Sequence, residues 1–221
     1  MQIQESRVLV VGATGVLGGV LARALVSRGA RVALAGRDAE RLAALGGELD
    51  APTLAFDAYD LDGAAALPAA AREALGGLEG VVVAAGAVAF GPTDDTGEEI
   101  AEHLFTVNAL APIAVLRSAL PLLEKGGAVA AITGVVAERP MAGMAAYSAS
   151  KAALGAWLTA ARTEQRRRGV GVLEAVLPHM DTGLVDRAIA GTPPKLPAGE
   201  DVDAVIARVL DAWEAGERQV H

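Results

Sequence analysis

The chain has 221 residues, a length that suits one α/β domain with a sizeable core. Its formal net charge of -8 argues against a nucleic-acid partner, because phosphate binding needs a basic protein face. It contains no cysteine, which excludes disulfide bonds, thiolate catalysis and cysteine-ligated metals.

Short apolar runs alternate with segments of helical spacing along the whole chain. Strands are predicted at residues 7–11, 31–35, 53–56, 80–85, 128–133 and 170–177, with a short edge strand at 218–220. Helices are predicted at residues 15–28, 62–75, 98–123, 144–168 and 201–215, and Asp38 is expected to cap a further short helix. Pro68 predicts an irregular first half of its helix, and Pro112 predicts a kink in the 98–123 helix.

This alternation predicts the fold class. Strands that alternate with helices form βαβ units, whose parallel sheet is covered on both faces. We therefore expect an α/β, Rossmann-type doubly wound parallel sheet, with residues 1–221 forming a single dinucleotide-binding and catalytic domain. No charged-then-apolar leader precedes the first strand, and the longest apolar run, near residues 81–90, is too short to span a bilayer. These features predict a cytoplasmic protein without a membrane partner.

A glycine-rich turn, GATGVLGG, follows the first predicted strand and leads into a helix. Glycines allow a tight turn and let backbone N–H groups approach a pyrophosphate at the N-terminus of the helix. The strand–turn–helix context favours a dinucleotide site over a βα turn without a ligand. The predicted cofactor contacts in this turn are Gly12, Thr14, Gly15 and Gly18.

The end of the second strand predicts which dinucleotide binds. NAD usually calls for an acidic residue there, to hold the ribose hydroxyls. This chain has Gly36 followed by Arg37. A small residue leaves room for a 2′-phosphate, and a guanidinium can bind that phosphate through its planar fork, so NADP is favoured over NAD. The alternative is that Arg37 simply begins a solvated helix.

Tyr147 and Lys151 open the 144–168 helix and lie four residues apart, so both project from one face. A phenol has a reference pKa near 10, and a nearby ammonium favours the phenolate and lowers that value. The pair can therefore serve as a tuned proton donor for a carbonyl. The alternative is a pair on the helix surface without a role.

Further positions follow in an order that is typical of one family. They are Asp57 after the third strand, Ala84-Ala85-Gly86 after the fourth, Asn108 in the 98–123 helix and the segment 178–182 after the sixth strand. With the glycine turn and Tyr147-Ser-Ala-Ser-Lys151, they make the chain resemble the short-chain dehydrogenase/reductase superfamily over nearly its whole length. The resemblance implies hydride transfer between a nicotinamide and a carbonyl or alcohol of a small molecule.

The resemblance also implies roles for individual residues. Tyr147 would be the catalytic acid/base, and Lys151 would bind the nicotinamide ribose and lower the pKa of Tyr147. Asn108 would hold a proton-relay water and bend its helix. Contacts with the cofactor would come from Asp57 at the adenine, from Ala85 and Gly86 along the dinucleotide, and from Pro178 and Thr182 near the nicotinamide or pyrophosphate. The long helices would form the interface of a homodimer or homotetramer.

The chain departs from the family at the position thirteen residues before Tyr147, where the family's catalytic Ser is replaced by Gly134. Losing one such hydrogen-bonding group typically costs roughly 100- to 1,000-fold in rate. Thr133 could help only if the chain twists at the strand end, because neighbouring strand residues point to opposite faces. His179 stands where the family has Gly after Pro178; it could donate a hydrogen bond to the substrate, or it could simply be solvated or structural.

Three functions remain open from the sequence. The first is an NADP(H)-dependent oxidoreductase acting on a small or medium carbonyl or alcohol. The second, suggested by Gly134, is an NAD(P)-binding module with weak or no catalysis, such as a sensor or scaffold. The third is a nucleotide-sugar enzyme, which is disfavoured because only about 70 residues follow Lys151. The short substrate loop before residue 201 predicts an open site, and nothing indicates a metal.

Overall fold

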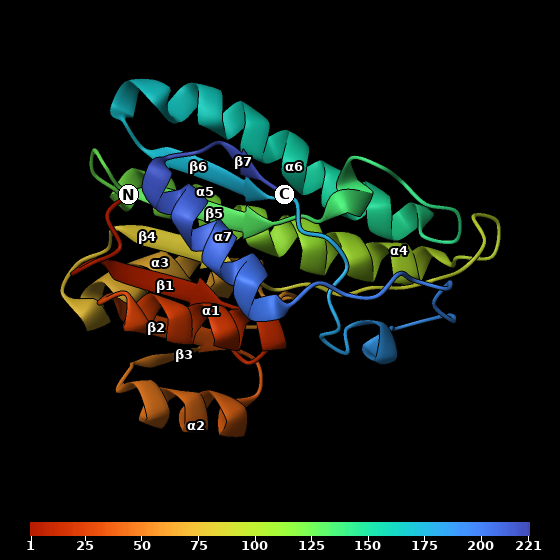
Figure 1. Cartoon of the computed structure of the whole chain (residues 1–221), viewed down its shortest axis with the longest axis horizontal. Helices are drawn as coiled ribbons and strands as arrows, with labels where there is room; N and C mark the ends of the chain where they lie inside the picture. The colour runs from red at the N-terminus through yellow and green to blue at the C-terminus, as the bar shows by residue number, and fades with distance from the viewer.

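The seven parallel strands of one sheet form the centre of the protein, in the order β3-β2-β1-β4-β5-β6-β7 (Figure 1). The structure is a computed structural model that describes residues 1–221. The strands are β1 (Arg7–Val11), β2 (Arg31–Gly36), β3 (Thr53–Ala55), β4 (Gly80–Val83), β5 (Ala128–Ile132), β6 (Gly171–Ala175) and β7 (Gln219–Val220). Every pairing between neighbouring strands is parallel, so the predicted doubly wound α/β fold is confirmed.

Helices cover both faces of this sheet (Figure 1). The α-helices are α1 (Val16–Ser27), α2 (Ala39–Leu49), α3 (Leu61–Leu75), α4 (Glu98–Phe105), α5 (Ala111–Ala119), α6 (Ala145–Gln165) and α7 (Val202–Ala215). Side chains of α1, α2 and α7 form one apolar cluster, and those of α3, α5 and α6 form a second. Along β1, Val8 and Val10 belong to the first cluster while Leu9 and Val11 belong to the second, as the alternation of strand side chains requires.

Aspartate caps fix the starts of three helices. The side chains of Asp38, Asp60 and Asp201 each accept a hydrogen bond from the backbone N–H three residues later. The predicted cap at Asp38 is therefore confirmed. Strand boundaries agree with the sequence to within about two residues, and the differences lie mainly at the carboxyl ends, where the chain leaves the sheet earlier than predicted to form loops.

The effect of Pro68 is smaller than predicted. Helix α3 runs without interruption from Leu61 to Leu75 and contains Pro68 as a buried residue. The proline removes one hydrogen bond, but Leu67, Ala71 and Leu75 bury their side chains in the second apolar cluster. Tertiary packing therefore maintains the helix, and the expected irregular first half is absent.

The irregularity predicted near Pro112 lies slightly earlier in the chain. Residues Thr106–Leu110 (η1) form a π-helical turn between α4 and α5, and Asn108 lies within it. Pro112 itself occupies the first turn of α5, where a missing N–H costs little. A 3-10 turn, η2 (Leu120–Leu122), ends this segment.

The helical segment Glu98–Leu122 is long and apolar enough to span a membrane. The expectation from the sequence rested only on the uninterrupted apolar run near residues 81–90, which is too short to do so. In this structure 56% of its most apolar window is buried inside the protein. Helix α5 contributes its apolar residues to the second cluster, against α3 and the sheet. The segment therefore serves as a core helix of this α/β domain.

Candidate active site

The predicted site residues gather beyond the carboxyl ends of the parallel strands, toward the strand tips in Figure 1. The glycine turn follows β1, Gly86 follows β4, and Tyr147 and Lys151 lie in the first turns of α6. Ligands of open α/β sheets bind at this edge, in the crevice where the strand order reverses. Here that reversal lies between β1 and β4.

The glycine turn packs backbone against backbone. A Cβ added at Gly12, whose φ is +85°, would lie 2.6 Å from the backbone nitrogen of Ala85. One added at Gly18 would lie 2.1 Å from the carbonyl oxygen of Gly12. Gly15 is the N-cap of α1, whose first turn carries no acidic side chain. The positive end of this helix dipole therefore faces the turn without a carboxylate to neutralise it.

Gly36 brings the end of β2 against the same turn. A Cβ at Gly36 would lie 2.8 Å from Cγ2 of Thr14. The next residue, Arg37, is exposed. Asp57, after β3, is also exposed, and its Oδ1 accepts a hydrogen bond from the backbone N–H of Tyr59 at 2.9 Å. Arg37 and Asp57 thus lie at the surface, at the ends of neighbouring strands.

The structure brings Lys151, Asn108 and Gly86 together. The Lys151 ammonium is buried and donates to the carbonyl oxygen of Ile132 at 3.0 Å. A Cβ added at Gly86 would lie 3.3 Å from Nζ of Lys151 and 3.4 Å from Oδ1 of Asn108. The absence of a side chain at Gly86 therefore leaves space directly beside the ammonium.

The Asn108 side chain ties the loop after β4 to helix α6. Its Oδ1 accepts from the backbone N–H of Ala87 at 2.9 Å, and its Nδ2 donates to the Ala87 carbonyl at 2.9 Å and to Ser150 Oγ at 3.0 Å. Ser150 Oγ in turn donates to the carbonyl of Tyr147 at 2.7 Å. Both amide N–H groups of Asn108 are occupied, so this side chain has no donor left for a relay water.

Burial shifts the pKa values of the central pair in opposite directions. It raises the pKa of the Tyr147 phenol to about 12 and lowers the pKa of the Lys151 ammonium to about 8. The expected lowering of the Tyr147 pKa by Lys151 is therefore not found, because burial shifts that pKa in the opposite direction. At neutral pH Tyr147 carries its proton and Lys151 carries its charge.

The hydroxyl of Thr133 is hydrogen-bonded inside the protein. It is buried and donates to Oε1 of Glu174 at 2.9 Å, so it points to a neighbouring strand. The next residue, Gly134, has φ 101° and ψ 157°, a region that is essentially restricted to glycine. The backbone at the family's Ser position therefore has a conformation that a Ser would rarely adopt.

The loop after β6 carries Pro178, His179 and Thr182, all of which are partly buried. The His179 side chain is 21% exposed, and its Nε2 lies 3.3 Å from Oδ1 of Asp181. This contact gives His179 a partner within its own loop. The Thr182 backbone N–H donates to the Met180 carbonyl at 2.8 Å, which keeps the segment turned on itself.

Apolar side chains from the loop after β4, from helix α4 and from the segment between β5 and α6 surround Tyr147. They form a small cluster of Val88, Ala89, Phe90, Leu104, Val136, Met144 and Tyr147. Backbone hydrogen bonds of 2.9 Å, from Ile189 to Val88 and from Phe90 to Ala190, hold the loop after β6 against the loop after β4. The surroundings of the phenol are thus largely apolar, which agrees with its raised pKa.

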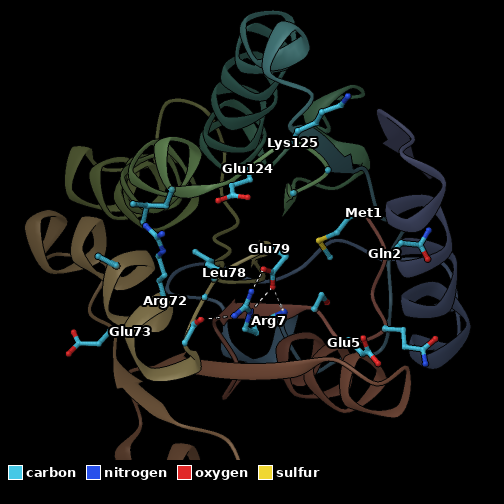
Figure 2. Close-up of a pocket in the computed structure, with 18 residues that line it drawn as sticks. Met1, Gln2, Glu5, Arg7, Arg72, Glu73, Leu78, Glu79, Glu124 and Lys125 are labelled. Atoms are coloured by element: carbon cyan, nitrogen blue, oxygen red, sulfur yellow. Dashed lines mark hydrogen bonds and ion pairs between the residues drawn. The ribbon is translucent and has the colours of Figure 1, made fainter.

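A cavity also lies at the opposite end of the sheet. Its volume is about 1050 Å³, and the amino ends of the strands line it, with Arg7 and Glu79 at its floor (Figure 2). Arg7 Nε donates to Glu79 at 2.9 Å, and its Nη1 donates to the Gly76 carbonyl. This pairing raises the pKa of Arg7 and lowers that of Glu79, so both charges are compensated. No predicted site residue lines this cavity.

Sequence reasoning missed two polar residues behind the site. Ser150 bridges Asn108 and Tyr147, and Glu174 accepts the hydroxyl of Thr133. A signal for Glu174 was present, because a glutamate inside a predicted buried strand is unusual.

Comparisons with known proteins agree with this geometry. The profile of the family described as short chain dehydrogenase matches residues 6–191. A short chain dehydrogenase of Pseudocercospora fijiensis is 32% identical over 185 residues, which are 80% of this chain and 59% of the fungal protein. The chain thus spans about three fifths of that relative's length.

Solved structures are similar over nearly the whole chain. A short-chain oxidoreductase of Thermus thermophilus is 34% identical with a TM-score of 0.79, covering 93% of this chain and 95% of the other. A short chain dehydrogenase of Burkholderia cenocepacia in complex with NADP is 26% identical with a TM-score of 0.86, covering 100% and 98%.

Proposed function

Because this chain belongs to the short chain dehydrogenase family, we propose that it is an NADP(H)-dependent oxidoreductase that transfers a hydride between the nicotinamide and a small carbonyl or alcohol. The observation that carries this proposal is the buried Tyr147–Lys151 pair, whose ammonium lies beside the side-chain-free position of Gly86. We further propose that residues 1–221 act as one catalytic domain of a cytoplasmic homo-oligomer.

The chain fits a dinucleotide on its own geometry. The close backbone packing at Gly12 and Gly18 and the uncompensated start of α1 suit a pyrophosphate. The space beside Gly86 suits a ribose, whose hydroxyls Lys151 would bind with the N–H groups that Ile132 does not use. Asp57 would contact the adenine, and Ala85, Pro178 and Thr182 would line the remaining dinucleotide. When bound, the nicotinamide supplies or accepts the hydride.

Tyr147 would then manage the proton. Its phenol is protonated at neutral pH and can donate to the substrate oxygen as negative charge develops there. The charge of Lys151 would stabilise the phenolate that remains after the donation. Asn108 and Ser150 would hold the first turns of α6 in place for this transfer. Gly134 offers no hydroxyl, so Tyr147 carries the interaction with the substrate oxygen that relatives share between Tyr and Ser.

The reaction is tested by NADPH consumption against a panel of ketones, aldehydes and diketones, with Tyr147→Phe beside the wild type. We expect turnover that falls at least about 100-fold in the variant, because the proton donor is lost. NADPH binding should stay within about threefold in the variant, since the phenol does not hold the dinucleotide. Turnover that is unchanged by the substitution contradicts the assignment of Tyr147.

The departure at Gly134 favours a second candidate, an NAD(P)-binding module with weak or no catalysis. Its distinguishing result is tight NADPH binding without turnover of any compound in the panel. That result would favour a sensor or scaffold over an oxidoreductase.

The preference for NADP rests on Gly36 and Arg37, and the Burkholderia relative was solved with NADP. In Arg37→Ala we expect NADPH to bind about tenfold more weakly, while the Kd for NADH stays unchanged. Arg41→Ala, a surface arginine one turn further along, is the matched control. An equal loss for both cofactors would contradict a contact between Arg37 and the 2′-phosphate.

A further inference from the structure

Glu174 is a carboxylate inside a strand that is otherwise apolar. It lies in β6, within the sequence GVLEA, and is 6% exposed. A buried charge is costly unless hydrogen bonds and neighbouring charges compensate it. The residues around Glu174 therefore indicate what this carboxylate does.

The carboxylate contacts two elements of the candidate site. Its Oε1 accepts the hydroxyl of Thr133, just beyond β5, at 2.9 Å. The same oxygen also faces Gly155 of α6, where an added Cβ would come within 2.6 Å of it. Gly155 thus provides the space that the Glu174 side chain occupies.

The same two elements hold Lys151. The Ile132 carbonyl, directly before Thr133, accepts the Lys151 ammonium at 3.0 Å. Lys151 lies one helical turn before Gly155 on α6. Glu174 is therefore bonded to the strand end that carries the acceptor and lies close against the helix that carries the donor.

The effect of Glu174 on Lys151 is geometric. Burial lowers the pKa of Lys151, and no charged neighbour contributes to that shift. The charge of Glu174 instead acts on Arg162 of α6, whose pKa is lowered by burial and raised in part by Glu174. The Arg162 guanidinium itself donates hydrogen bonds to the backbone carbonyls of Val172 and Arg218.

We propose that Glu174 is a positioning residue for Lys151, acting through the hydrogen bond to Thr133 and the contact with Gly155. The inference rests on the proposed function, because Lys151 is the residue that would bind the nicotinamide ribose. Without the bond, the backbone hydrogen bond from the Thr133 N–H to the Ala175 carbonyl at 2.9 Å still pairs β5 with β6. The side-chain tie at the end of β5 is lost, however, and the Ile132 carbonyl then holds the ammonium beside Gly86 less precisely.

The test uses the full chain with paired substitutions. Glu174→Met and Thr133→Val remove the acceptor or the donor with little change in shape, whereas Glu174→Gln and Thr133→Ser keep the bond. For each variant, kcat, the Kd for NADPH and Tm are measured. Val129→Ala, a buried change at the far end of β5, controls for loss of stability alone.

We expect Glu174→Met and Thr133→Val to lose at least about tenfold in kcat and in NADPH affinity, because misplacement of a reacting group is costly. The Gln and Ser variants should stay within about threefold of the wild type, and Val129→Ala should lower only Tm. The proposal is overturned if Glu174→Met and Thr133→Val lower only Tm. It is also overturned if Glu174→Gln loses as much kcat and NADPH affinity as Glu174→Met.

Failure of the proposed reaction can be told apart from failure of this inference. If the wild type turns over no substrate, the reaction fails, and the Kd for NADPH alone decides the role of Glu174. The positioning role is supported if Glu174→Met and Thr133→Val bind NADPH more weakly while Glu174→Gln binds it as the wild type does. Equal binding in all variants, or no binding to the wild type, overturns it.

Discussion

Gly134 stands at the position of the family's catalytic Ser, in a backbone conformation that favours glycine. An added Cβ would find space, since its nearest neighbour is the Leu177 carbonyl oxygen at 3.6 Å, but φ is 101°. We therefore predict that Gly134→Ser lowers the free energy of unfolding by roughly 1–3 kcal/mol and does not raise kcat.

Urea denaturation and NADPH-dependent turnover check this prediction. Gly47→Ala, in a helix with open space around it, is the control and should be about 1 kcal/mol more stable than the wild type. A serine variant that is as stable as the wild type and faster would show that the site accommodates the usual hydroxyl.

Lys151 should make the protein less stable at neutral pH. Its folded-state pKa is lowered from 10.5 to about 8, so the unfolded chain holds the proton more tightly. The penalty is complete below pH 8 and disappears as pH rises from about 8 to about 10.5. We predict that Lys151→Met is more stable by on the order of 1–3 kcal/mol at pH 7, with activity abolished.

Denaturation curves measured at several pH values test the sign of this effect. The advantage of the Met variant should shrink between pH 8 and about 10.5, where the wild type gains stability. A wild type that is more stable than the variant at pH 7 would mean that the bond to the Ile132 carbonyl outweighs the cost of burying the charge.

Much of the site could be predicted residue by residue. The order and spacing of the motifs were sufficient to predict that Tyr147, Lys151, Asn108 and Gly86 belong to one site. The partner of Thr133 could not be predicted, because it depends on the pairing of Ile132 with Ala175 across two strands that are far apart in sequence. The predicted lowering of the Tyr147 pKa was also wrong, because the burial that raises it comes from segments that are far apart in the sequence.

At the scale of elements, the π turn between α4 and α5 joins fold and site. Asn108 makes three hydrogen bonds there, two of them to the Ala87 backbone. We predict that Asn108→Ala lowers the free energy of unfolding by about 2–4 kcal/mol, because buried polar groups lose their partners, and weakens NADPH binding.

Chemical denaturation and NADPH titration measure both effects of Asn108→Ala. Ser118→Ala, in α5, removes a hydroxyl that bonds only the Val115 carbonyl, and should change stability by less than about 0.5 kcal/mol. Equal stability of the two variants would argue against a structural role of the Asn108 amide.

The order of the elements followed from the sequence because each strand and helix has its own local pattern. The behaviour of the two prolines did not. Pro68 lies inside a regular helix because α3 packs firmly against α5 and the sheet, and Pro112 begins a helix that the π turn has already separated from α4. Such outcomes depend on tertiary packing, which a local pattern does not contain.

At the scale of the whole molecule, we predict a homo-oligomer. Leu110, at the end of the π turn, is 48% exposed on a helical segment that is otherwise rich in buried apolar residues. Light scattering at micromolar concentration should give a dimer or tetramer, and Leu110→Glu should shift it toward monomer. Leu61→Glu, at the start of α3, is the matched control and should leave the assembly intact. A monomeric wild type contradicts the prediction.

The most direct test of the account is whether hydride reaches a carbonyl compound from the bound cofactor. NADPH that carries deuterium at both C4 positions of the nicotinamide is incubated with the enzyme and the carbonyl panel, and the alcohols are analysed by mass spectrometry. The account predicts one deuterium in the product with wild type and almost none with Tyr147→Phe, although both bind NADPH. NADPH bound without deuterium in any product, or equal transfer by both proteins, would contradict it.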